Sequence, residues 1–272
     1  MARVLAISSQ VVRGHIGLSA TVPALQALGH ETWPVPTVLL SNHPGHAHGT
    51  GLRIAPETID QLFAALDGNG WLGEIDAVMT GYLPSVDHVH VAGYIVRRLM
   101  AEQALTYLCD PILGDEPKGL YLDPDAAAAV RDELVPLADI LTPNRFELGW
   151  LIGQAPSDLN TMCDMARELC DGSVVVTSAA RADDMLQTLL VTPDTAQRCE
   201  VPLRADVPHG TGDFFAGLFL GHRLRGASDD EAMGRAAAGV DVAIAASAGK
   251  DELSLVPQQA WAIADPLTIT QI

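Results

Sequence analysis

The segment VPHGTGDFFAGLFLGHRLRG places Gly210, Thr211, Gly212 and Asp213 where a loop turns into an apolar helical pattern. A glycine-rich turn that opens a helix presents unpaired backbone N–H groups and the positive end of the helix dipole, which suit a transferring phosphoryl group. The Asp213 carboxylate could accept a proton from an alcohol held beside that phosphate. Because the chain contains no GxxxxGK(S/T) motif, this would be a kinase without a P-loop. Taken alone, the four residues are explained more simply by a capped helix start.

A second polar group occupies the segments DPILGD, which begins at Asp110, and TPNRFEL, which contains Glu147. Carboxylates at the ends of two strands can hold Mg²⁺, usually through water, against the β- and γ-phosphates of a nucleotide. Asp110 could equally cap a strand before Pro111, and Glu147 could be a first-turn acid of a helix. The joint appearance of these acids with the turn at 210–213 favours phosphoryl transfer over separate structural explanations.

Short apolar runs alternate with helical patterns along the chain, and these elements must position the two groups. Apolar runs bounded by turn signals indicate buried strands, whereas longer stretches with apolar residues at helical spacing indicate helices. The strands are expected at residues 3–10, 30–40, 75–83, 105–113, 138–144, 173–179 and 185–192. The helices are expected at residues 18–28, 56–68, 86–103, 123–135, 145–152, 158–171, 211–225 and 229–247.

This alternation predicts an α/β protein whose mostly parallel central sheet is covered by helices on both faces. No repeat, low-complexity tract or linker divides the chain, so residues 1–272 are expected to form a single domain. Ligands of such sheets bind at the carboxyl ends of the strands, which makes the residues just after each strand the candidates for a site. These candidates are Ser8, Ser9, Gln10, Ser41, Asn42, His43, Thr80, Gly81, Tyr82, Asp110, Asp115, Thr142, Asn144, Glu147, Thr177 and Ser178.

The composition restricts the classes of partner. The formal net charge is −18 and only two of the 16 basic residues are lysine, which argues against a broad basic surface for nucleic acid or anionic lipid. No apolar run approaches the roughly 20 residues of a membrane span, and the first residues lack the pattern of a secretory signal. The cysteines show neither a CxxC pair nor zinc-ligand spacing, so a reduced cytoplasm and small-molecule partners fit best.

Six segments carry a family resemblance over most of the chain: LAISSQVVRGHIG, SNHPGHAHGTG, TGYL, DPILGD, PLADILTPNRFEL and HGTGD, in this order. Together they resemble the pyridoxal kinases of the ribokinase superfamily. The resemblance implies a ribokinase-like three-layer α/β/α fold and a single kinase domain that forms a homodimer. It also implies ATP-dependent phosphorylation, with Mg²⁺, of the 5′-hydroxymethyl group of pyridoxal in vitamin B6 salvage, with pyridoxine and pyridoxamine as further substrates.

The resemblance assigns roles on the phosphate side of the site. It makes Asp213 the general base and the backbone N–H groups of residues 210–212 an anion hole for the γ-phosphate. Asp110 and Glu147 look like the acids that hold the metal and the phosphates in this family. The other positions matched to the nucleotide phosphates are Thr142, Asn144, Thr177, Ser178, Thr211 and Gly212.

On the vitamin side, the resemblance makes Ser9 a hydrogen-bond partner of the pyridine ring and Tyr82 an aromatic at the substrate pocket. A hydroxyl and a ring face suit a flat heteroaromatic ligand, although a strand-end turn and a packed aromatic would explain the same two residues. His43 and Pro44 lie in the segment that resembles the loop covering the substrate. The resemblance therefore makes both of them substrate-binding candidates.

Three departures from the family pattern bear on substrate choice. Pro44 stands where a threonine is common, and Gly49 stands where an aromatic residue follows, so the loop over the ring is expected to grip differently. Leu120 stands where some members have a cysteine that reacts with the aldehyde of pyridoxal. No thiohemiacetal can therefore form at this position.

The remaining basic and histidine residues of these segments allow two explanations each. His43, His46 and His48 form an HxxHxH run that could suggest a transition-metal site, but polar loop surface is the simpler explanation. Arg13 resembles a basic residue beside the covering loop in some members, or is an ordinary exposed arginine. His209 could touch a phosphate, or could face solvent in its turn.

The sequence is compatible with three functions. A pyridoxal kinase is the first, and a hydroxymethylpyrimidine kinase with the same glycine turn and base is the second. The third is a weakly active protein that binds pyridoxal or its phosphate, against which the intact Asp213, Asp110 and Glu147 argue. A nicotinamide-linked dehydrogenase is disfavoured, because the first strand leads into SSQVVRGHIG and not into GxGxxG.

Overall fold

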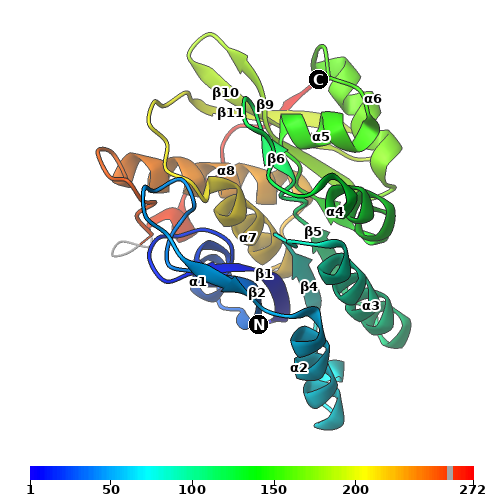
Figure 1. Cartoon of the computed structure of the whole chain (residues 1–272). Helices are drawn as coiled ribbons and strands as arrows, with labels where there is room; N and C mark the ends of the chain where they lie inside the picture. Colours follow the sequence, from blue (N-terminus) through cyan, green and yellow to red (C-terminus); the bar gives the residue numbers. More distant parts are fainter. Residues whose placement is uncertain (256–259) are drawn as a thin grey trace.

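A ten-stranded sheet runs through the computed structural model, which describes residues 1–255 and 260–272 (Figure 1). Its central strands β2, β1, β4, β5, β8 and β9 are parallel neighbours, whereas β3, β10, β11 and β12 add antiparallel edges. The strands are β1 (Arg3–Val11), β2 (Glu31–Leu40), β3 (Gly51–Arg53), β4 (Ala77–Thr80), β5 (Thr106–Cys109), β8 (Ile140–Leu141), β9 (Ser173–Ala182), β10 (Met185–Val191), β11 (Ala196–Pro202) and β12 (Thr270–Gln271). A separate two-stranded ribbon consists of β6 (Gly114–Asp115) and β7 (Gly119–Leu120).

Helices cover both faces of this sheet and make three layers (Figure 1). One face carries α1 (Leu18–Ala27), α7 (Thr211–Leu224) and α8 (Asp229–Ala246). The opposite face carries α2 (Pro56–Gly68), α3 (Val86–Glu102), α4 (Pro124–Ala129), α5 (Arg145–Ile152) and α6 (Leu159–Leu169). Short helical turns occur at Leu72–Glu74, Val130–Leu134, Val135–Leu137 and Ala260–Ile263. The predicted α/β class with a mostly parallel sheet covered on both faces is confirmed.

The local sequence explains where two of the predicted helices begin and end. The helix expected at residues 56–68 has those bounds in the structure and begins at Pro56, whose missing N–H costs nothing in a first turn. The helix at 145–152 also has its predicted bounds, with the Asn144 side chain capping its start and Gly153 in the left-handed conformation ending it. Here capping chemistry and helical periodicity agree.

Other predicted elements differ from the structure. The strands predicted at 75–83 and 138–144 are only four and two residues long, since their last residues turn into loops at the edge of the sheet. The helix predicted at 123–135 is an α-helix only as far as Ala129 and continues as a π-helical turn. The strands β3, β6, β7, β11 and β12 were not predicted.

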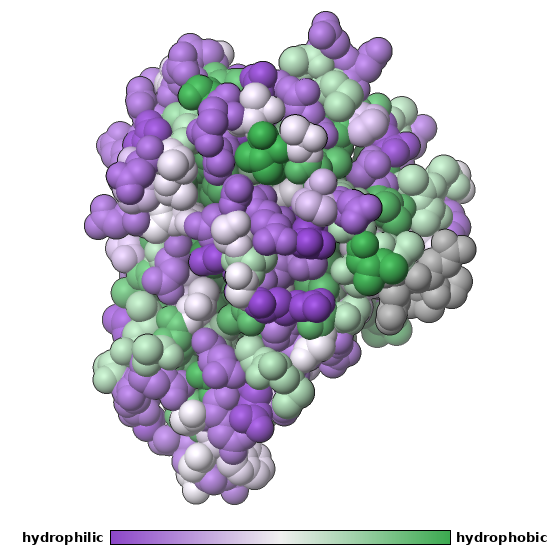
Figure 2. All heavy atoms as spheres, turned by 180° about the vertical axis from the view of Figure 1, so that it is seen from behind, coloured by the Kyte–Doolittle hydropathy of each residue, from purple (hydrophilic) through white to green (hydrophobic). Residues whose placement is uncertain are grey.

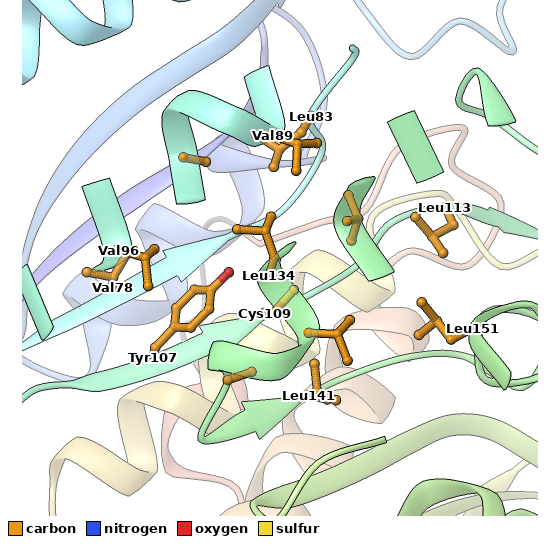
Figure 3. Packing of buried hydrophobic residues seen from close by; sticks show 14 of the residues in the cluster. Val78, Leu83, Val89, Val96, Tyr107, Cys109, Leu113, Leu134, Leu141 and Leu151 are labelled. Atoms are coloured by element: carbon orange, nitrogen blue, oxygen red, sulfur yellow. The ribbon is translucent and has the colours of Figure 1, made fainter. Parts of the chain in front are cut away.

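The core forms because the central strands are buried on both faces. In β1, the segment RVLAISSQV is almost entirely buried, as expected of a parallel strand between two helical layers. Tyr107 of β5 is fully buried, and its hydroxyl lies 2.7 Å from the hydroxyl of Thr80 on the neighbouring strand, which satisfies both polar groups (Figure 3). The strand ends that carry the polar candidates are therefore held rigidly.

The surface is mostly hydrophilic on the face opposite to that of Figure 1, with apolar residues scattered among polar ones (Figure 2). This distribution agrees with the net charge of −18. No helix in the described ranges is both long and apolar enough to cross a membrane.

A buried histidine predicts acid sensitivity of the fold. Burial, assisted by the charges of Arg235 and Arg225, lowers the pKa of His222 in α7 from 6.5 to about 4. The unfolded chain therefore binds an extra proton between these pH values, so the stability contributed by neutral His222 is present above about pH 6.5 and is lost as the pH falls toward 4. Urea midpoints measured at pH 7, 5.5 and 4.5 are expected to fall, and less steeply in His222→Gln. An unchanged pH slope in the variant would contradict this assignment.

Candidate active site

The turn before α7 requires glycine at its first position. Gly210 has φ +96°, and a Cβ there would lie 1.8 Å from the carbonyl oxygen of His15 in the loop between β1 and α1. Any other residue would therefore push these two loops apart. The first helical hydrogen bond runs from the N–H of Phe214 to the carbonyl of Gly210. The N–H groups of Thr211 and Gly212 form no hydrogen bond within residues 1–255 and 260–272, so they can receive an anion.

Asp213 follows these two N–H groups in the first turn of α7. Burial raises the pKa of its carboxyl from 3.8 to about 6, although hydrogen bonds from the N–H of Gly17 and from its own N–H favour the ionised form. A carboxylate with a pKa near 6 is a better proton acceptor at neutral pH than an ordinary aspartate and is still largely ionised. The geometry therefore places a base beside an anion-binding turn.

Gly17 connects the base with the vitamin side of the site. It has φ +53°, and a Cβ there would lie 2.2 Å from the carbonyl oxygen and 2.3 Å from the hydroxyl oxygen of Ser9. Because Gly17 also donates its N–H to Asp213, the two predicted residues meet on opposite sides of one glycine. The absence of a side chain at this position lets them approach.

Asp110 ends β5 and is buried, with its Oδ1 accepting a hydrogen bond of 3.0 Å from the Thr142 hydroxyl. Burial, and then the negative charges of Asp213 and Glu147, raise the pKa of Asp110 well above its ordinary value. Asp110 is thus repelled by both of the other predicted acids. A cation between them would relieve this repulsion.

Glu147 is buried at the start of α5 and serves the loop after β5. Its Oε1 accepts the N–H groups of Leu113 and Gly114 at 2.8 and 3.3 Å, and its Oε2 accepts the N–H of Asn144 at 2.8 Å. Burial still raises its pKa to about 7. The Asn144 amide donates to the carbonyl of Gly114 at 2.8 Å, so this acid and amide hold the loop together.

These acids fit Mg²⁺ in the way that the ion usually binds beside a nucleotide. Among residues 1–255 and 260–272, no group of three His, Cys, Asp or Glu side chains is arranged to hold a metal ion alone. Mg²⁺ commonly keeps several waters and uses one or two carboxylates together with phosphate oxygens. Asp110 supplies a buried carboxylate with one oxygen outside its hydrogen bond to Thr142, whereas Glu147 already receives three N–H groups. Asp110 is therefore the better direct ligand.

A cavity of about 260 Å³ adjoins the anion-binding turn. Thr177, Ser178, Thr211 and Gly212 line part of it. Contrary to the prediction that they follow their strand, Thr177 and Ser178 lie inside β9, and Ser178 has the uncommon φ of +50° where the pairing of β9 with β10 is irregular. The rest of the cavity has an apolar part that could receive a flat ring, lined by Leu186, Val201, Val207, Phe215, Ala237, Val240 and Ile244, and a polar part formed by Arg181, Thr188, Arg204 and Asp241. All of the predicted nucleotide residues therefore lie at this cavity or beside the acids.

The predicted vitamin residues lie at the ends of β1 and β4. Ser8 and Ser9 are buried, and the Ser8 hydroxyl accepts the N–H of Tyr82 at 3.0 Å. The Tyr82 carbonyl accepts a hydrogen bond of 2.7 Å from Thr37 on β2, and burial raises the pKa of the Tyr82 phenol. These contacts fix the backbone of Tyr82, and its partly buried side chain packs against the hydrophobic core.

Residues 41–50 form the loop between β2 and β3, called the flap below. The His43 ring stacks on the His209 ring with centroids 3.7 Å apart, and its Nδ1 accepts the N–H of Gly45. Burial and the nearby positive charge of a protonated His209 lower the pKa of His43 to about 4. Pro44 is exposed beside this stack. The flap is thus docked against the residue that precedes the anion-binding turn.

Comparisons with known proteins agree with this arrangement. The sequence profile of the phosphomethylpyrimidine kinase family matches residues 14–255. Relatives named pyridoxal kinase PdxY are 37% identical in Deinococcus radiodurans, over 85% of this chain and 82% of the relative, and 35% identical in Leifsonia xyli, over 94% of both. A solved pyridoxal kinase from Leishmania donovani, in complex with ADP and pyridoxamine, has a TM-score of 0.91 at 27% identity and covers 99% of both chains. The chain belongs to the pyridoxal kinase family.

Several residues of this member of the pyridoxal kinase family escaped the sequence analysis. Arg204 closes one side of the nucleotide cavity by a bidentate pair with Asp241 of α8, at 2.8 and 3.1 Å. Arg181 lines the same cavity from β9. Gly17 supplies an N–H to the base. The second glycine of the GHIG segment could have drawn attention to Gly17 in the sequence. In contrast, no local sequence pattern shows that Arg204 and Asp241, which lie on different elements, form a pair.

Proposed function

We propose that the protein transfers the γ-phosphoryl group of ATP to the 5′-hydroxymethyl group of pyridoxal, and also accepts pyridoxine and pyridoxamine. The observation that carries this proposal is Asp213, a carboxyl with its pKa raised to about 6, in the same helical turn as two free N–H groups. That turn adjoins a cavity of nucleotide type. The family relationship supplies the ring of the acceptor.

In the proposed reaction, Asp213 orients the 5′-hydroxyl and takes its proton as the oxygen attacks the γ-phosphorus. The bond between this phosphorus and the bridging oxygen of the β-phosphate breaks, and ADP leaves. The N–H groups of Thr211 and Gly212 stabilise the charge on the transferring group, because they already point at that position and need no reorganisation. We propose the same role for the N–H group of Gly210, which also sets the turn that carries the other two.

Asp110 and Glu147 would hold Mg²⁺ beside the phosphates, directly or through water, and the ion would neutralise charge on the β- and γ-oxygens. Glu147 also keeps the loop at Leu113 and Gly114 in place. Thr142 orients the Asp110 carboxylate. We further propose that Asn144, Thr177 and Ser178 bind or orient the nucleotide phosphates, because Thr177 and Ser178 line the cavity and Asn144 lies against Glu147.

For the vitamin, we propose that the Ser9 hydroxyl hydrogen-bonds the pyridine ring and that the Tyr82 ring forms one wall. His43 and Pro44 cover the ring from the flap. In this chain the family aromatic is replaced by Gly49, so the stacked His43 and His209 rings provide the aromatic surface at that side. Leu120 in β7 provides only an apolar contact.

A second candidate is phosphorylation of hydroxymethylpyrimidine. The matching family profile is that of phosphomethylpyrimidine kinases, and the altered flap could admit another flat ring. A binding protein without useful turnover is the third alternative. All three functions would use the same residues at the same site. They therefore differ only in which substrate is phosphorylated and in the rate of turnover.

A side-by-side assay separates these functions. The purified protein, ATP and Mg²⁺ are incubated with pyridoxal, pyridoxine, pyridoxamine or hydroxymethylpyrimidine, and ADP formation and the phosphorylated product are measured. Turnover on pyridoxal well above that on hydroxymethylpyrimidine is expected. The reverse order would establish the second candidate, and tight binding of pyridoxal without turnover would establish the third.

We also propose that residues 1–272 act as a single kinase domain, that two copies form a homodimer, and that the protein works in the cytoplasm. One continuous sheet that holds both substrate sides supports the single domain. The four cysteines are free, which is typical of a reducing compartment. The dimer rests on the family resemblance, and a sedimentation-equilibrium mass of one chain would overturn it.

A further inference from the structure

Three loops surround the vitamin side of the site. They are the segment 12–17 after β1, the flap at 41–50, and the segment 247–254 after α8. The segment 12–17 lies against the proposed catalytic residues. The N–H of Gly17 is hydrogen-bonded to Asp213, and the carbonyl of His15 lies against Gly210. The flap must come close for the ring to be covered and must leave for the product to depart. What holds the flap to its neighbours therefore sets how tightly the vitamin is bound.

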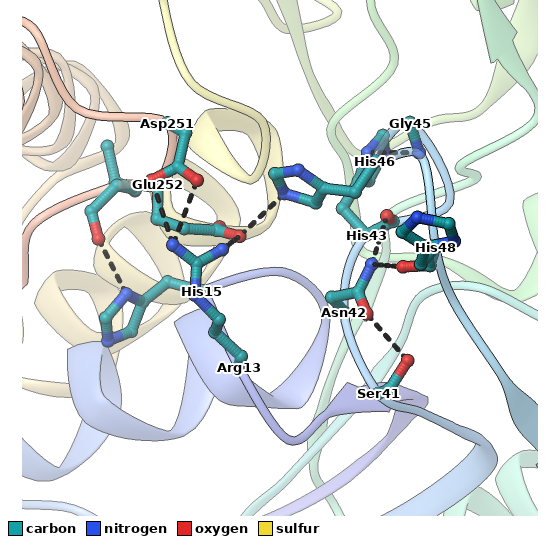
Figure 4. Close-up of polar contacts among 11 residues, drawn as sticks. Arg13, His15, Ser41, Asn42, His43, Gly45, His46, His48, Asp251 and Glu252 are labelled. Carbon is teal, nitrogen blue, oxygen red and sulfur yellow. Dashed lines mark hydrogen bonds and ion pairs between the residues drawn. The ribbon is translucent and has the colours of Figure 1, made fainter.

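Glu252 touches both of the other loops (Figure 4). Its Oε1 accepts a hydrogen bond of 2.9 Å from Arg13 in the first loop and another of 2.9 Å from Nε2 of His46 in the flap. Its carboxylate also lies against Gly14, where a Cβ would approach Oε2 to 2.2 Å. Only 14% of the Glu252 side chain is exposed, so these contacts take place in a partly dehydrated setting.

The segment that carries Glu252 is itself firmly anchored. Leu253 and Leu255 are buried, and the Leu253 carbonyl lies 2.6 Å from Nδ1 of His15. The N–H of Ser254 donates to the Ser247 hydroxyl at 2.8 Å, which closes the segment on the end of α8. Glu252 therefore acts from a fixed position, and removing its carboxylate leaves these anchors in place.

The flap is closed on itself and can move as one unit. The Asn42 amide donates to the carbonyls of His43 and His48 at 3.0 Å each (Figure 4). The N–H of Thr50 donates to the Ser41 hydroxyl at 2.9 Å. A contact at one flap residue is thus transmitted to the others. Docking His46 on Glu252 also brings His43 onto His209.

We propose that Glu252 is a positioning residue that holds the flap closed over the vitamin, through His46. This inference rests on the proposed function for the identity of the ligand. Glu252 does not touch the reacting atoms. It raises the fraction of molecules whose flap is already in the binding-competent position, which lowers the apparent KM for the vitamin without changing the chemical step.

The test compares Glu252→Ala with Asp251→Ala. Asp251 is the matched control, because it pairs with Arg13 at 2.9 Å from the same loop but forms no hydrogen bond or ion pair with a flap residue within residues 1–255 and 260–272; from the flap, only the charge of His46 acts on its carboxylate. In Glu252→Ala, KM for pyridoxal is expected to rise about tenfold, as when the competent fraction falls to about a tenth. In the same variant, kcat and KM for ATP are expected to stay within about twofold of the wild-type values, because Glu252 takes part in neither the chemical step nor ATP binding. Asp251→Ala should leave all three near the wild-type values.

Two further variants test the connection to the flap. Glu252→Gln keeps an acceptor for Nε2 of His46 and should restore part of the lost vitamin affinity. His46→Ala should raise KM for pyridoxal as Glu252→Ala does, and the double variant should be no worse than either single one, because both break the same contact. Additive effects of the two changes, or a loss of kcat in place of KM, would overturn the proposal.

Hydrogen exchange gives a readout that does not depend on turnover. Without ligand, amides of residues 44–49 are expected to exchange faster in Glu252→Ala than in the wild type or in Asp251→Ala, with the melting temperature unchanged. Equal exchange in all three proteins would overturn the flap assignment. If the wild type fails to phosphorylate pyridoxal, the proposed function fails, whereas the exchange result still decides whether Glu252 holds the flap.

Discussion

Changing Asp213 to asparagine is expected to lower kcat for pyridoxal by about 100-fold or more, as for the loss of a positioned base. The amide has nearly the same shape as the carboxylate, so folding and ADP binding should persist. Steady-state kinetics and ADP titration by calorimetry measure the two quantities separately. Asp125→Asn, a change of an exposed first-turn acid in α4, is the matched control and should leave kcat unchanged.

The same variant should be more stable than the wild type in the absence of ligands. The pKa of Asp213 is raised from 3.8 to about 6 on folding, so its contribution to stability is lost as the pH rises through 6. At pH 7.5 the wild type carries a partly buried charge that asparagine lacks. The melting temperature of Asp213→Asn should therefore exceed that of the wild type at pH 7.5, with a smaller difference at pH 5. Near-normal kcat in this variant would remove Asp213 from the role of base.

Alanine at Gly210 and alanine at Gly212 are expected to fail in different ways. At Gly210 the methyl group would overlap the His15 carbonyl, at an ideal distance of 1.8 Å, in a left-handed turn that costs an L-residue about 1–2 kcal/mol before any overlap. The melting temperature and kcat should both fall. At Gly212 a methyl group would meet no atom within 4 Å, so stability should hardly change.

Gly212→Ala should nevertheless impair the use of ATP, because the methyl group stands in the cavity where the phosphates approach. A rise in KM for ATP or a fall in kcat of about tenfold is expected, comparable to the loss of one anion-hole interaction at the lower end. Binding of pyridoxal should be affected less. Equal losses for both substrates together with a lower melting temperature would mean that Gly212 serves the helix start and not the nucleotide.

Local chemistry explains which parts of the fold and site the sequence could predict. Helix starts were predictable where a cap or a first-turn proline coincides with apolar periodicity, as at Pro56 and Asn144. The turn at 210–213 was predictable because a glycine pair before an apolar helix has few uses. Strand-end residues such as Asp110 were predictable because parallel strands end at one edge.

The features of the fold and site that the sequence did not predict depend on contacts between distant segments. The strand β11 alternates polar and apolar side chains only partly, with Gln197, Arg198 and Glu200 among its residues, and is stabilised by pairing with β10. The three backbone N–H groups on Glu147 come from two loops, so a helix acid and a loop anchor could not be told apart. Glu252 lies 206 residues from His46, and nothing in its own surroundings marks it as a partner.

In the proposed function, the two substrates are recognised largely by different parts of the chain. The cavity beside Gly212 is built from residues 177–244, whereas Ser9, Tyr82 and the flap come from residues 9–82. The two regions meet at the turn before α7, through Gly17 and His15. Mutations of Ser9, Tyr82 or the flap, which do not line that cavity, can therefore accumulate with little effect on it, whereas His15 and Gly17 are constrained by their contacts with the turn. A protein family with this arrangement can change the substrate that accepts the phosphoryl group while it keeps ATP as the donor.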